Sequence, residues 1–324
     1  MIKQLLRAIP LFAVVLASIP PCISQSYPSK PIRVVVPFSP GGGTDILARI
    51  LAPKLSERLG QPVIVDNRAG AAGTLGIDFT ARSAPDGHTL QVGSTSEIGI
   101  GATLHTKVPY NVLRDLTPVA ALASTPMVVV VHPSLPVKTI KDLIALAKTR
   151  PGELNYGSAG SGTGNHMCGE LFRYLTKADI AHIPYKGAAP ALADVVGGQV
   201  HIMFSTVPAA SGLIQAGRLR ALAVTTVQRY RTLPGIPTML EAGVANYEVE
   251  YWYGFFAPSA TPAAVIDRIH DESTRQLRNP EMIASLQARG LDPIPKSRKE
   301  FEAFVKQDIE RWAPAVKASG STGF

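Results

Sequence analysis

The sequence predicts an α/β fold in which two α/β domains are joined by two crossover strands, with a ligand cleft between them. Short β-rich runs alternate with amphipathic helical patterns along most of the chain. Two long extended stretches, near residues 124–132 and 245–257, interrupt this alternation. A chain that leaves the first unit, builds the second and then returns needs two such crossings. Two crossings behind a cleft suit closure around a small ligand.

The first unit begins with strands and helices in strict alternation. The expected elements are a strand at 32–37, a helix at 44–59, a strand at 63–65, a helix at 75–82 and a strand at 89–92. The first helix has its apolar residues on one side and ends at Gly60, and Pro85-Asp86-Gly87 ends the second. Short connections between successive strands predict parallel pairing with right-handed crossovers.

The second unit begins with the continuous apolar run Met127 to Val131, which is typical of a fully buried strand. The alternation then resumes with these expected elements: helix 140–148, strand 155–157, helix 165–175, strand 180–183, helix 190–196, strand 200–204, helix 209–215 and strand 219–224.

The extended stretch Tyr247 to Phe256 then leads into helical patterns at 263–278, 280–289 and 298–318. This order predicts how the chain divides. Residues 25–123 and 246–324 are expected to form domain 1, and residues 124–245 are expected to form domain 2.

Composition narrows the class of protein. The chain has 324 residues, of which 46% are apolar, so it can bury a sizeable core. Its formal charge is +8, but it contains no run of five or more basic residues, and aromatic residues make up only 6%. A nucleic-acid-binding protein would cluster its charge and offer rings for base stacking. We therefore expect a basic, solvated surface and no nucleic-acid partner.

The first 24 residues have the pattern of a secretory signal peptide. Lys3 and Arg7 precede a twelve-residue apolar stretch from Ala8 to Ile19, and small residues precede a cleavage site after Ser24. Cys22 offers lipid attachment as an alternative, but the Ile-Pro-Pro before it matches a lipidation motif poorly. No later run reaches about 18 uninterrupted apolar residues. We expect a soluble, periplasmic protein.

Removal of the signal peptide would leave Cys168 as the single cysteine. One thiol cannot form an internal disulfide, so the exported chain must rely on its core for stability. Cys168 lies in an apolar-periodic stretch without metal-ligand spacing, which predicts a buried, unreactive thiol.

The first chemical signal is the segment Pro37 to Asp45, PFSPGGGTD, between a strand and a helix. Its three glycines let the backbone bring several N–H groups toward one point, and the helix start adds partial positive charge. Such a loop can hold an anion without lysine or arginine. The alternative is a structural turn in which Thr44 and Asp45 cap the helix. This loop alone leaves both alternatives open.

The second signal is the segment Tyr156 to His166, YGSAGSGTGNH, which links a strand to a helix in the other unit. Its hydroxyl and N–H groups could receive a second polar group of a ligand. Both loops follow the carboxyl ends of their strands, so they are expected to face each other across the cleft. His166, at the helix start, either contacts ligand or only packs, and both alternatives stay open.

Motifs for catalysis are missing from the sequence. Ser158 and Ser161 do not lie in G-x-S-x-G, neither glycine-rich loop fits G-x-G-x-x-G, and the chain contains no H-E-x-x-H. We therefore expect no enzyme, no cofactor and no metal. The competing hypothesis is a secreted hydrolase that uses Ser158 or Ser161 with His166 as its base.

Further segments accompany the two loops: residues 65–73 (VDNRAGAAG), residues 183–187 (IPYKG) and residues 190–200, with Asp194 and the sequence GGQ. In this order the segments resemble the Bug, or TctC-like, family of extracytoplasmic solute receptors, which are associated with tripartite tricarboxylate transporters. The resemblance covers essentially the whole chain after the signal peptide. It implies a type II periplasmic-binding-protein fold that closes on its ligand at a hinge.

The resemblance also implies a ligand. It would be a small carboxylate, such as a di- or tricarboxylate, an acidic amino acid or an aromatic acid. Loop backbone amides, hydroxyls and ordered water would hold it. The implied residues of the first half of the site are Phe38, Ser39, Gly41, Gly42 and Thr44, with Gly73 from the neighbouring loop. Those of the second half are Ser158, Ser161, Thr163 and His166.

For four residues the sequence leaves two possible roles open. Asp45 either contacts ligand or organises the helix start, and Lys186 either supplies a counter-charge or flanks a turn. His201 and Ser205 stand where family members often carry an acid. If either lines the pocket, the lost negative charge would favour a more anionic ligand or one without an amine. We expect His201 only to end a turn, and we keep Ser205 among the binding residues.

The resemblance implies uptake as the function. The chain would capture a small carboxylate by hinge closure, as a monomer, and deliver it to membrane subunits of the tripartite tricarboxylate type. The alternative is a ligand sensor that acts on a signalling partner.

Overall fold

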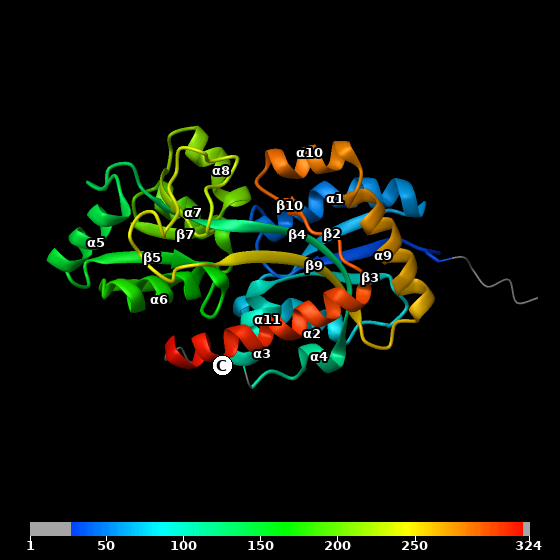
Figure 1. Cartoon of the computed structure of the whole chain (residues 1–324). Helices are drawn as coiled ribbons and strands as arrows, with labels where there is room; N and C mark the ends of the chain where they lie inside the picture. The colour runs from blue at the N-terminus through cyan, green and yellow to red at the C-terminus, as the bar shows by residue number, and fades with distance from the viewer. Residues whose placement is uncertain (1–26, 106, 320–324) are drawn as a thin grey trace, which may run out of the picture.

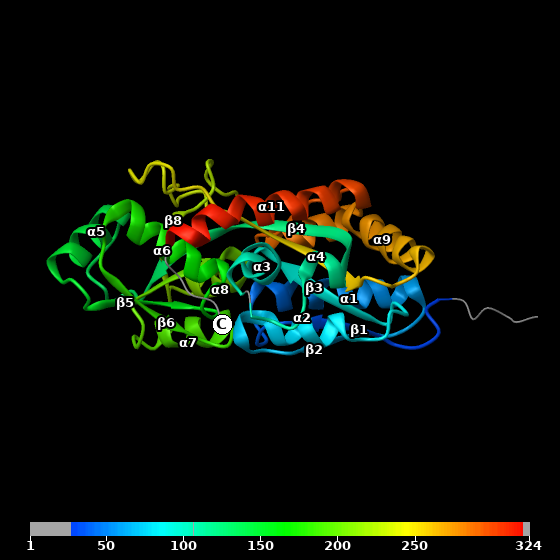
Figure 2. The same cartoon turned by 90° about the horizontal axis from the view of Figure 1, so that it is seen from below.

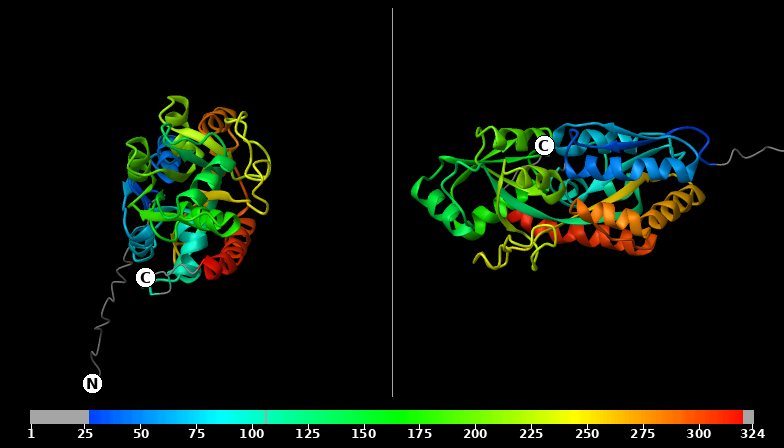
Figure 3. Two further views of the ribbon diagram at one scale, coloured as in Figure 1. Left: turned by 90° about the vertical axis from the view of Figure 1, so that its left-hand side faces the viewer. Right: turned by 90° about the horizontal axis from the view of Figure 1, so that it is seen from above.

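The computed structural model describes residues 27–105 and 107–319 (Figure 1). The predicted signal peptide, residues 1–24, lies outside the described residues. The chain forms two α/β units at opposite ends of an elongated molecule, as the views in Figure 1 and Figure 3 show. This arrangement confirms the predicted α/β fold class.

The first sheet has the strand order β2-β1-β3-β9-β4. These strands are β1 (Ile32–Val36), β2 (Val63–Asn67), β3 (Thr89–Ser94), β9 (Glu250–Pro258) and β4 (Leu116–Val131). As predicted, β1 pairs in parallel with β2 and with β3. The returning strand β9 is antiparallel to both of its neighbours, β3 and β4. The short β10 (Asp292–Pro293) adds an antiparallel pairing to β4.

Helices cover both faces of the first sheet. Apolar residues of α1 (Gly43–Leu59), α9 (Ala263–Leu277) and α10 (Pro280–Ala288) share one buried cluster with the sheet. Residues of α2 (Thr74–Ala81) and α11 (Arg298–Ser319) pack in another, around Trp252 and Phe256 of β9. This unit also contains four short helical segments: η1 (Ala71–Gly73), η2 (Thr95–Ile100), α3 (Gly101–Leu104) and α4 (Val112–Asp115).

The second sheet is built around β5 (Leu154–Ser158), which pairs in parallel with β6 (Ile180–Pro184) and β7 (Ile202–Thr206). One end of β4 lies antiparallel to β7 and to β8 (Arg220–Val224). Two helices share the first buried cluster, α5 (Ile140–Thr149) and α6 (Gly164–Thr176). Two others pack in a separate cluster, α7 (Ala188–Val196) and α8 (Val207–Gln215).

One strand, β4, belongs to both sheets. Its residues 116–126 pair with β9 in the first sheet, and its residues 127–131 pair with β7 and β8 in the second. The sequence predicted a crossing near 124–132, and the strand begins earlier, at Leu116. The second crossing also differs from its predicted start near 245, because β9 begins at Glu250. Before it, the N–H of Val249 donates to the carbonyl of Thr225, at 3.1 Å.

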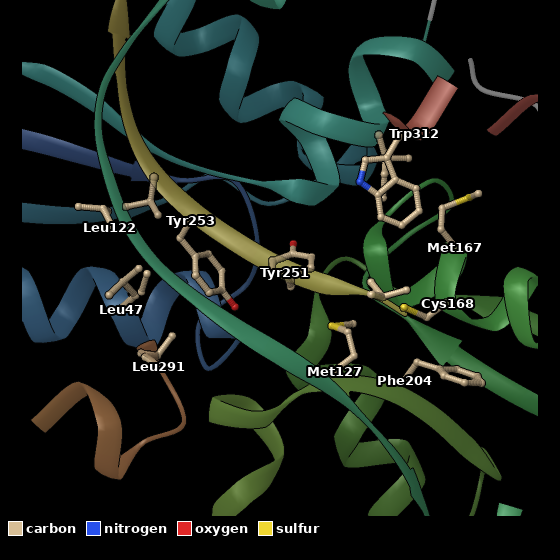
Figure 4. Packing of buried hydrophobic residues seen from close by; sticks show 14 of the residues in the cluster. Leu47, Leu122, Met127, Met167, Cys168, Phe204, Tyr251, Tyr253, Leu291 and Trp312 are labelled. Carbon is tan, nitrogen blue, oxygen red and sulfur yellow. The ribbon is translucent and has the colours of Figure 1, made fainter. Parts of the chain in front are cut away.

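The largest buried cluster runs through both units and joins them. Figure 4 shows Met127 of β4, Phe204 of β7 and Tyr251 and Tyr253 of β9 in this cluster. Trp312 of α11 belongs to it as well, and Figure 2 shows α11 (red) running along the molecule toward α6. Cys168 is fully buried, as predicted, and burial raises the pKa of its thiol to about 12. Among the described helices, none has the length and apolar character needed to cross a bilayer.

The close packing of β9 generates a prediction. A Cβ at Gly254 would overlap the Phe301 ring and lie 3.0 Å from the carbonyl oxygen of Ala120. Gly254→Ala should therefore lower the free energy of unfolding by about 1–3 kcal/mol. Chemical denaturation measures the change. The matched control is Gly212→Ala, at an exposed helical position with open space around it, where alanine should be neutral or stabilising. Equal stability of the two variants would contradict the packing described for β9.

Candidate functional site

A small cavity of about 20 Å³ lies between the two sheets. Its walls come from both units and from the returning strand β9. The lining residues are Phe38, Gly42, Gly43, Thr44, Ser96, Ala159, Asn165, Ala188, Thr206, Tyr251 and Tyr253. Most of them follow the carboxyl ends of β1, β3, β5 and β7, which is where parallel α/β sheets bind ligands.

Four helices begin at this cavity, α1, α6, α7 and α8, and each contributes a lining residue at or beside its first residue. No side chain at the N-cap of any of them accepts a hydrogen bond from the helix. By contrast, Thr139 caps α5 and Asn279 caps α10, both away from the cavity. The first N–H groups of a helix have no partner within it and carry its partial positive charge. The cavity thus gathers several such ends at one place.

A missing cap alone would not distinguish this place, because α2 and α9 also lack side-chain caps. The convergence of the four helix starts on one cavity distinguishes it. No lysine, arginine, histidine, aspartate or glutamate is among the lining residues in the described part of the chain. Such a site suits an anion that is bound by N–H and O–H donors rather than by a counter-ion.

Hydroxyl groups complete the lining. The hydroxyl groups of Thr206 and Tyr253 are buried and interact with each other, although not in ordinary hydrogen-bond geometry. Both lie against Gly43, because a Cβ there would overlap the Tyr253 hydroxyl and lie 2.8 Å from Thr206 Oγ1. Buried polar groups normally have a partner. A bound acceptor could provide one for either hydroxyl.

The two units touch each other around the cavity. The N–H of Gly164, at the start of α6, donates to Ser96 Oγ at 2.8 Å. The N–H of Ser39 donates to the carbonyl of Lys186 at 3.4 Å, and Gly187 packs closely on Ser39. This is a closed arrangement, with contacts from both units on the same small space.

Several residues implicated by the sequence build the first loop. Phe38, Gly42 and Thr44 line the cavity. Asp45 Oδ2 instead accepts from the N–H of Gly41 at 2.9 Å, and its Oδ1 accepts from Asn67 Nδ2 at 2.9 Å. Burial raises the pKa of Asp45, but hydrogen bonds from Arg49, Gly41 and Asn67 outweigh burial and lower it below its usual range. The geometry shows Asp45 organising the loop and the helix start.

Other residues implicated by the sequence lie outside the lining. Gly73 packs on Glu97 and Phe38, with a positive φ of 94°. Ser39 contacts the facing unit. Ser205 is fully buried in β7, where its hydroxyl donates to the carbonyl of Thr206 at 3.2 Å. Because successive strand residues point to opposite faces, it is Thr206 that reaches the cavity.

The second glycine-rich loop is held together by its own side chains. Ser158 Oγ accepts from the N–H of Gly160 at 3.0 Å and lies 2.6 Å from His182 Nε2. The hydroxyl of Thr163 donates to the carbonyl of Gly160 at 2.7 Å. Ser158, Ser161 and Thr163 are not among the cavity-lining residues, whereas Ala159 and Asn165 are. The loop therefore presents its backbone and Asn165 to the cavity.

His166 also holds this loop. Its Nδ1 accepts from the N–H of Gly162 at 3.0 Å, and its ring stacks on His182 with centroids 4.0 Å apart. Burial lowers the pKa of His166 and, together with His166 and Arg173, lowers that of His182 to about 3. The predicted hydrolase pairing of Ser158 with His166 is absent from these contacts. Ser158 pairs with His182 and is completely buried.

Lys186 and His201 lie outside the cavity and take part in hydrogen bonds that hold the backbone. Lys186 is exposed, and its carbonyl receives the N–H of Ser39. His201 Nδ1 lies 2.8 Å from Asn155 Oδ1 and accepts from the N–H of Asn155 at 3.2 Å, so it links β5 to the segment before β7. Neither residue lines the cavity.

Sequence reasoning missed several lining residues, namely Gly43, Ser96, Ala159, Asn165, Ala188, Thr206, Tyr251 and Tyr253. Two signals could have found some of them. Tyr251 and Tyr253 are two apart on β9 and so share a face. Ser96 follows the carboxyl end of β3, which pairs with β1, the strand before the first glycine-rich loop.

A larger groove of about 300 Å³ lies between α6 and α11. It is lined by Met167, Glu170, Leu171, Tyr174, Trp312, Pro314 and Ala315. Most of this lining is apolar, and none of its residues is the first residue of a described helix. The smaller cavity, where four helices begin, is therefore the better candidate for an anion. Across the described residues, no cluster of three or more histidine, cysteine, aspartate or glutamate side chains could hold a metal ion.

Comparisons with known proteins agree on one family. The family model described as "Tripartite tricarboxylate transporter family receptor" matches residues 47–321. Protein BugT of Bordetella pertussis is 38% identical over 319 residues, which cover 98% of this chain and 98% of that protein.

Solved structures of similar proteins contain bound acids. The structure of R. palustris Rpa4515 with adipate has a TM-score of 0.89 and 35% identity, and the match covers 91% of this chain and 99% of that one. MatC from Rhodopseudomonas palustris with bound malate has a TM-score of 0.85 and 31% identity, covering 90% of this chain and 100% of that one.

The loop contacts of Asp45 generate a prediction. A carboxylate with a lowered pKa stabilises the fold above its unfolded pKa of about 3.8, and this stabilisation is lost as the pH falls through the lower folded value. Asp45→Asn should therefore lower the free energy of unfolding at pH 7 by about 1–3 kcal/mol. Urea denaturation at pH 7 and at pH 3 measures the free energy of unfolding of the variant and the wild type. We expect the difference between the two proteins to be smaller at pH 3. A difference that stays constant with pH would contradict the role of the charge.

Proposed function

Because the chain belongs to the family of tripartite tricarboxylate transporter receptors, which are solute-binding proteins and not enzymes, we propose that it is a periplasmic receptor for a small carboxylate. Dicarboxylates are the first class to test, since relatives of similar fold hold adipate and malate. One observation carries the proposal. Four helix starts meet at a cavity where, among the residues that the structure describes, no side chain at a helix N-cap caps them and no charged side chain is in the lining.

The proposed binding residues fall into two sets. Phe38, Gly42, Gly43, Thr44 and Ser96 belong to the first unit, and Ala159, Asn165, Ala188 and Thr206 belong to the second. Tyr251 and Tyr253 of β9 lie between them. Ser39, Gly41, Asp45, Gly73, Ser158, Ser161, Thr163, His166 and Ser205 would shape the loops around this lining.

Capture would proceed by closure. Residues 25–123 and 246–324 form one domain in this proposal, residues 124–245 form the other, and β4 with the approach to β9 forms the hinge. The ligand touches donors of both domains only when they close, so binding shifts the population toward the closed form.

Export would remove the signal peptide near Ser24 and place the monomeric receptor in the periplasm. There the closed receptor would deliver its acid to membrane subunits of the tripartite tricarboxylate type. The alternative, a sensor for a signalling partner, shares the same binding step and differs only in what the closed form contacts.

Thermal unfolding with a panel of acids tests the proposal. Adipate, malate, a tricarboxylate, an acidic amino acid, an aromatic acid and a monocarboxylate are each added to the chain beginning at Gln25. A binding acid at 100 times its Kd adds about 2.7 kcal/mol of stability. We expect a concentration-dependent rise for a few related acids. No rise with any acid, in protein unfolded and refolded to release retained ligand, would contradict the proposal.

Gly43→Ala tests the cavity itself. The added Cβ would overlap the Tyr253 hydroxyl and crowd Thr206 Oγ1 at the place where the domains meet. An overlap that costs about 1–3 kcal/mol lowers affinity about 5- to 150-fold. Isothermal titration calorimetry with the best acid of the panel measures this, with Gly212→Ala as the control that should keep wild-type affinity. Unchanged affinity in a folded Gly43→Ala protein would place the ligand elsewhere.

A further inference from the structure

A buried carboxyl group lies directly behind the cavity. Glu97 of η2 is 1% exposed and is not among the lining residues. Its Oε1 accepts from the N–H of Ser94 at 2.8 Å, and its Oε2 lies 2.5 Å from Ser94 Oγ. Burial raises the pKa of Glu97 to about 7, against the lowering effect of hydrogen bonds from Ser94 and Gln91.

A chain of hydroxyl groups connects this carboxyl group to the cavity. Ser94 Oγ lies 2.7 Å from the Tyr251 hydroxyl oxygen, which in turn lies 2.7 Å from Ser96 Oγ. Ser96 Oγ also accepts the N–H of Gly164 from the facing unit. Tyr251 and Ser96 line the cavity, and Figure 4 shows Tyr251 projecting from β9. Each of the three hydroxyls has one proton to donate.

Counting these protons shows what an ionised Glu97 requires. The carboxylate has no proton, so Ser94 donates its own to Glu97. Tyr251 must then donate to Ser94, and Ser96 must donate to Tyr251. All protons point inward, toward Glu97. Ser96 and Tyr251 then turn only lone pairs toward the cavity.

A protonated Glu97 reverses the chain. The carboxylic acid donates to Ser94, Ser94 donates to Tyr251, and Tyr251 donates to Ser96. Ser96 still accepts the N–H of Gly164, and its own proton is now free to point into the cavity. One proton on Glu97 thus changes the cavity wall from acceptor to donor.

We propose that Glu97 is a positioning residue for the ligand, and that capture of a carboxylate takes up one proton from solvent onto Glu97. A carboxylate can only accept hydrogen bonds. If the lone pairs of Ser96 and Tyr251 faced those of the carboxylate, neither side would have a hydrogen-bond donor. Leaving buried polar groups unpaired in this way costs free energy. The proton added to Glu97 removes that conflict and supplies a donor through Ser96. This inference rests on the proposed function, since it assumes a carboxylate ligand.

Several titratable groups lie around Glu97. Burial raises the pKa values of the neighbouring tyrosines and lowers those of two histidines. These residues are Tyr110, Tyr251, Tyr253, His105 and His166. From α11, Asp308 packs on Gly99 of η2, and burial raises the pKa of its carboxyl group against the lowering effect of Trp252 Nε1 and Arg311 Nη2, each at 2.7 Å. Of these two buried carboxyl groups, Glu97 is the one that the hydroxyl chain connects to the cavity.

Calorimetric titration of the wild-type chain with adipate and with malate measures the proton directly. Titration at pH 8 in phosphate and in Tris, buffers that differ in ionisation enthalpy, gives the number of protons taken up. We expect this number to approach one. We also expect affinity to fall about tenfold per pH unit above the Glu97 pKa of about 7, and to level off below it.

Glu97→Gln separates this role from a merely structural one. The amide can donate from Nε2 to Ser94 and accept the Ser94 N–H at Oε1, as the protonated acid does. The variant should therefore bind with an affinity that does not change between pH 6 and pH 9, and without proton uptake. The control is Glu170→Gln, a largely buried glutamate that accepts from the Tyr156 hydroxyl away from the cavity. It should keep the wild-type pH dependence.

Tyr251→Phe provides a second test if Glu97→Gln does not fold. Loss of the hydroxyl disconnects Ser96 from Glu97, so the pH dependence should again disappear. Binding of an acid by the wild-type chain with no proton uptake and no pH dependence would overturn this inference and leave the proposed function intact. Wild-type pH dependence in Glu97→Gln would also overturn it. Failure of every acid to bind at every pH would instead contradict the proposed function.

Discussion

The starts of α1, α6, α7 and α8 lie around one small cavity. Ser96 Oγ accepts the first N–H of α6, but among the described residues no capping side chain accepts from the start of α1, α7 or α8. Helix ends of like partial charge repel each other, so their convergence favours a bound anion. Gly43 permits this approach, since any side chain there would fill the space that Tyr253 and Thr206 occupy.

The strands β4 and β9 connect the cavity to the rest of the molecule. β4 is shared by both sheets, so movement of one unit against the other must bend or twist it. β9 presents Tyr251 and Tyr253 to the cavity, while Trp252 packs on the opposite face with Phe256 and Phe301. The cavity wall is thus anchored in the core of the first unit. Ser96 accepts a hydrogen bond from the first residue of α6, so the hydroxyl chain from Glu97 reaches the other unit.

The sequence predicted the alternation of strands and helices well, because short loops and apolar periodicity are local signals. It also indicated the glycine-rich loops, and of their predicted residues Phe38, Gly42 and Thr44 line the cavity. It could not assign Tyr251, Tyr253 and Thr206, since buried aromatic and β-branched strand residues read as core whether or not a cavity adjoins them. Ser158 and His166 present the opposite difficulty. Polar side chains in a glycine-rich loop can bind a ligand or fold the loop, and only the hydrogen bonds to Gly160 and Gly162 distinguish the two.

A crystal structure of the chain with a bound dicarboxylate such as adipate would show which groups hold the acid. We expect carboxylate oxygens about 2.7–3.2 Å from backbone nitrogens at the starts of α1 and of at least one helix of the second unit. We also expect no lysine or arginine side chain in contact with the acid. A ligand held by a basic side chain, or bound in the apolar groove between α6 and α11, would contradict binding by the helix starts.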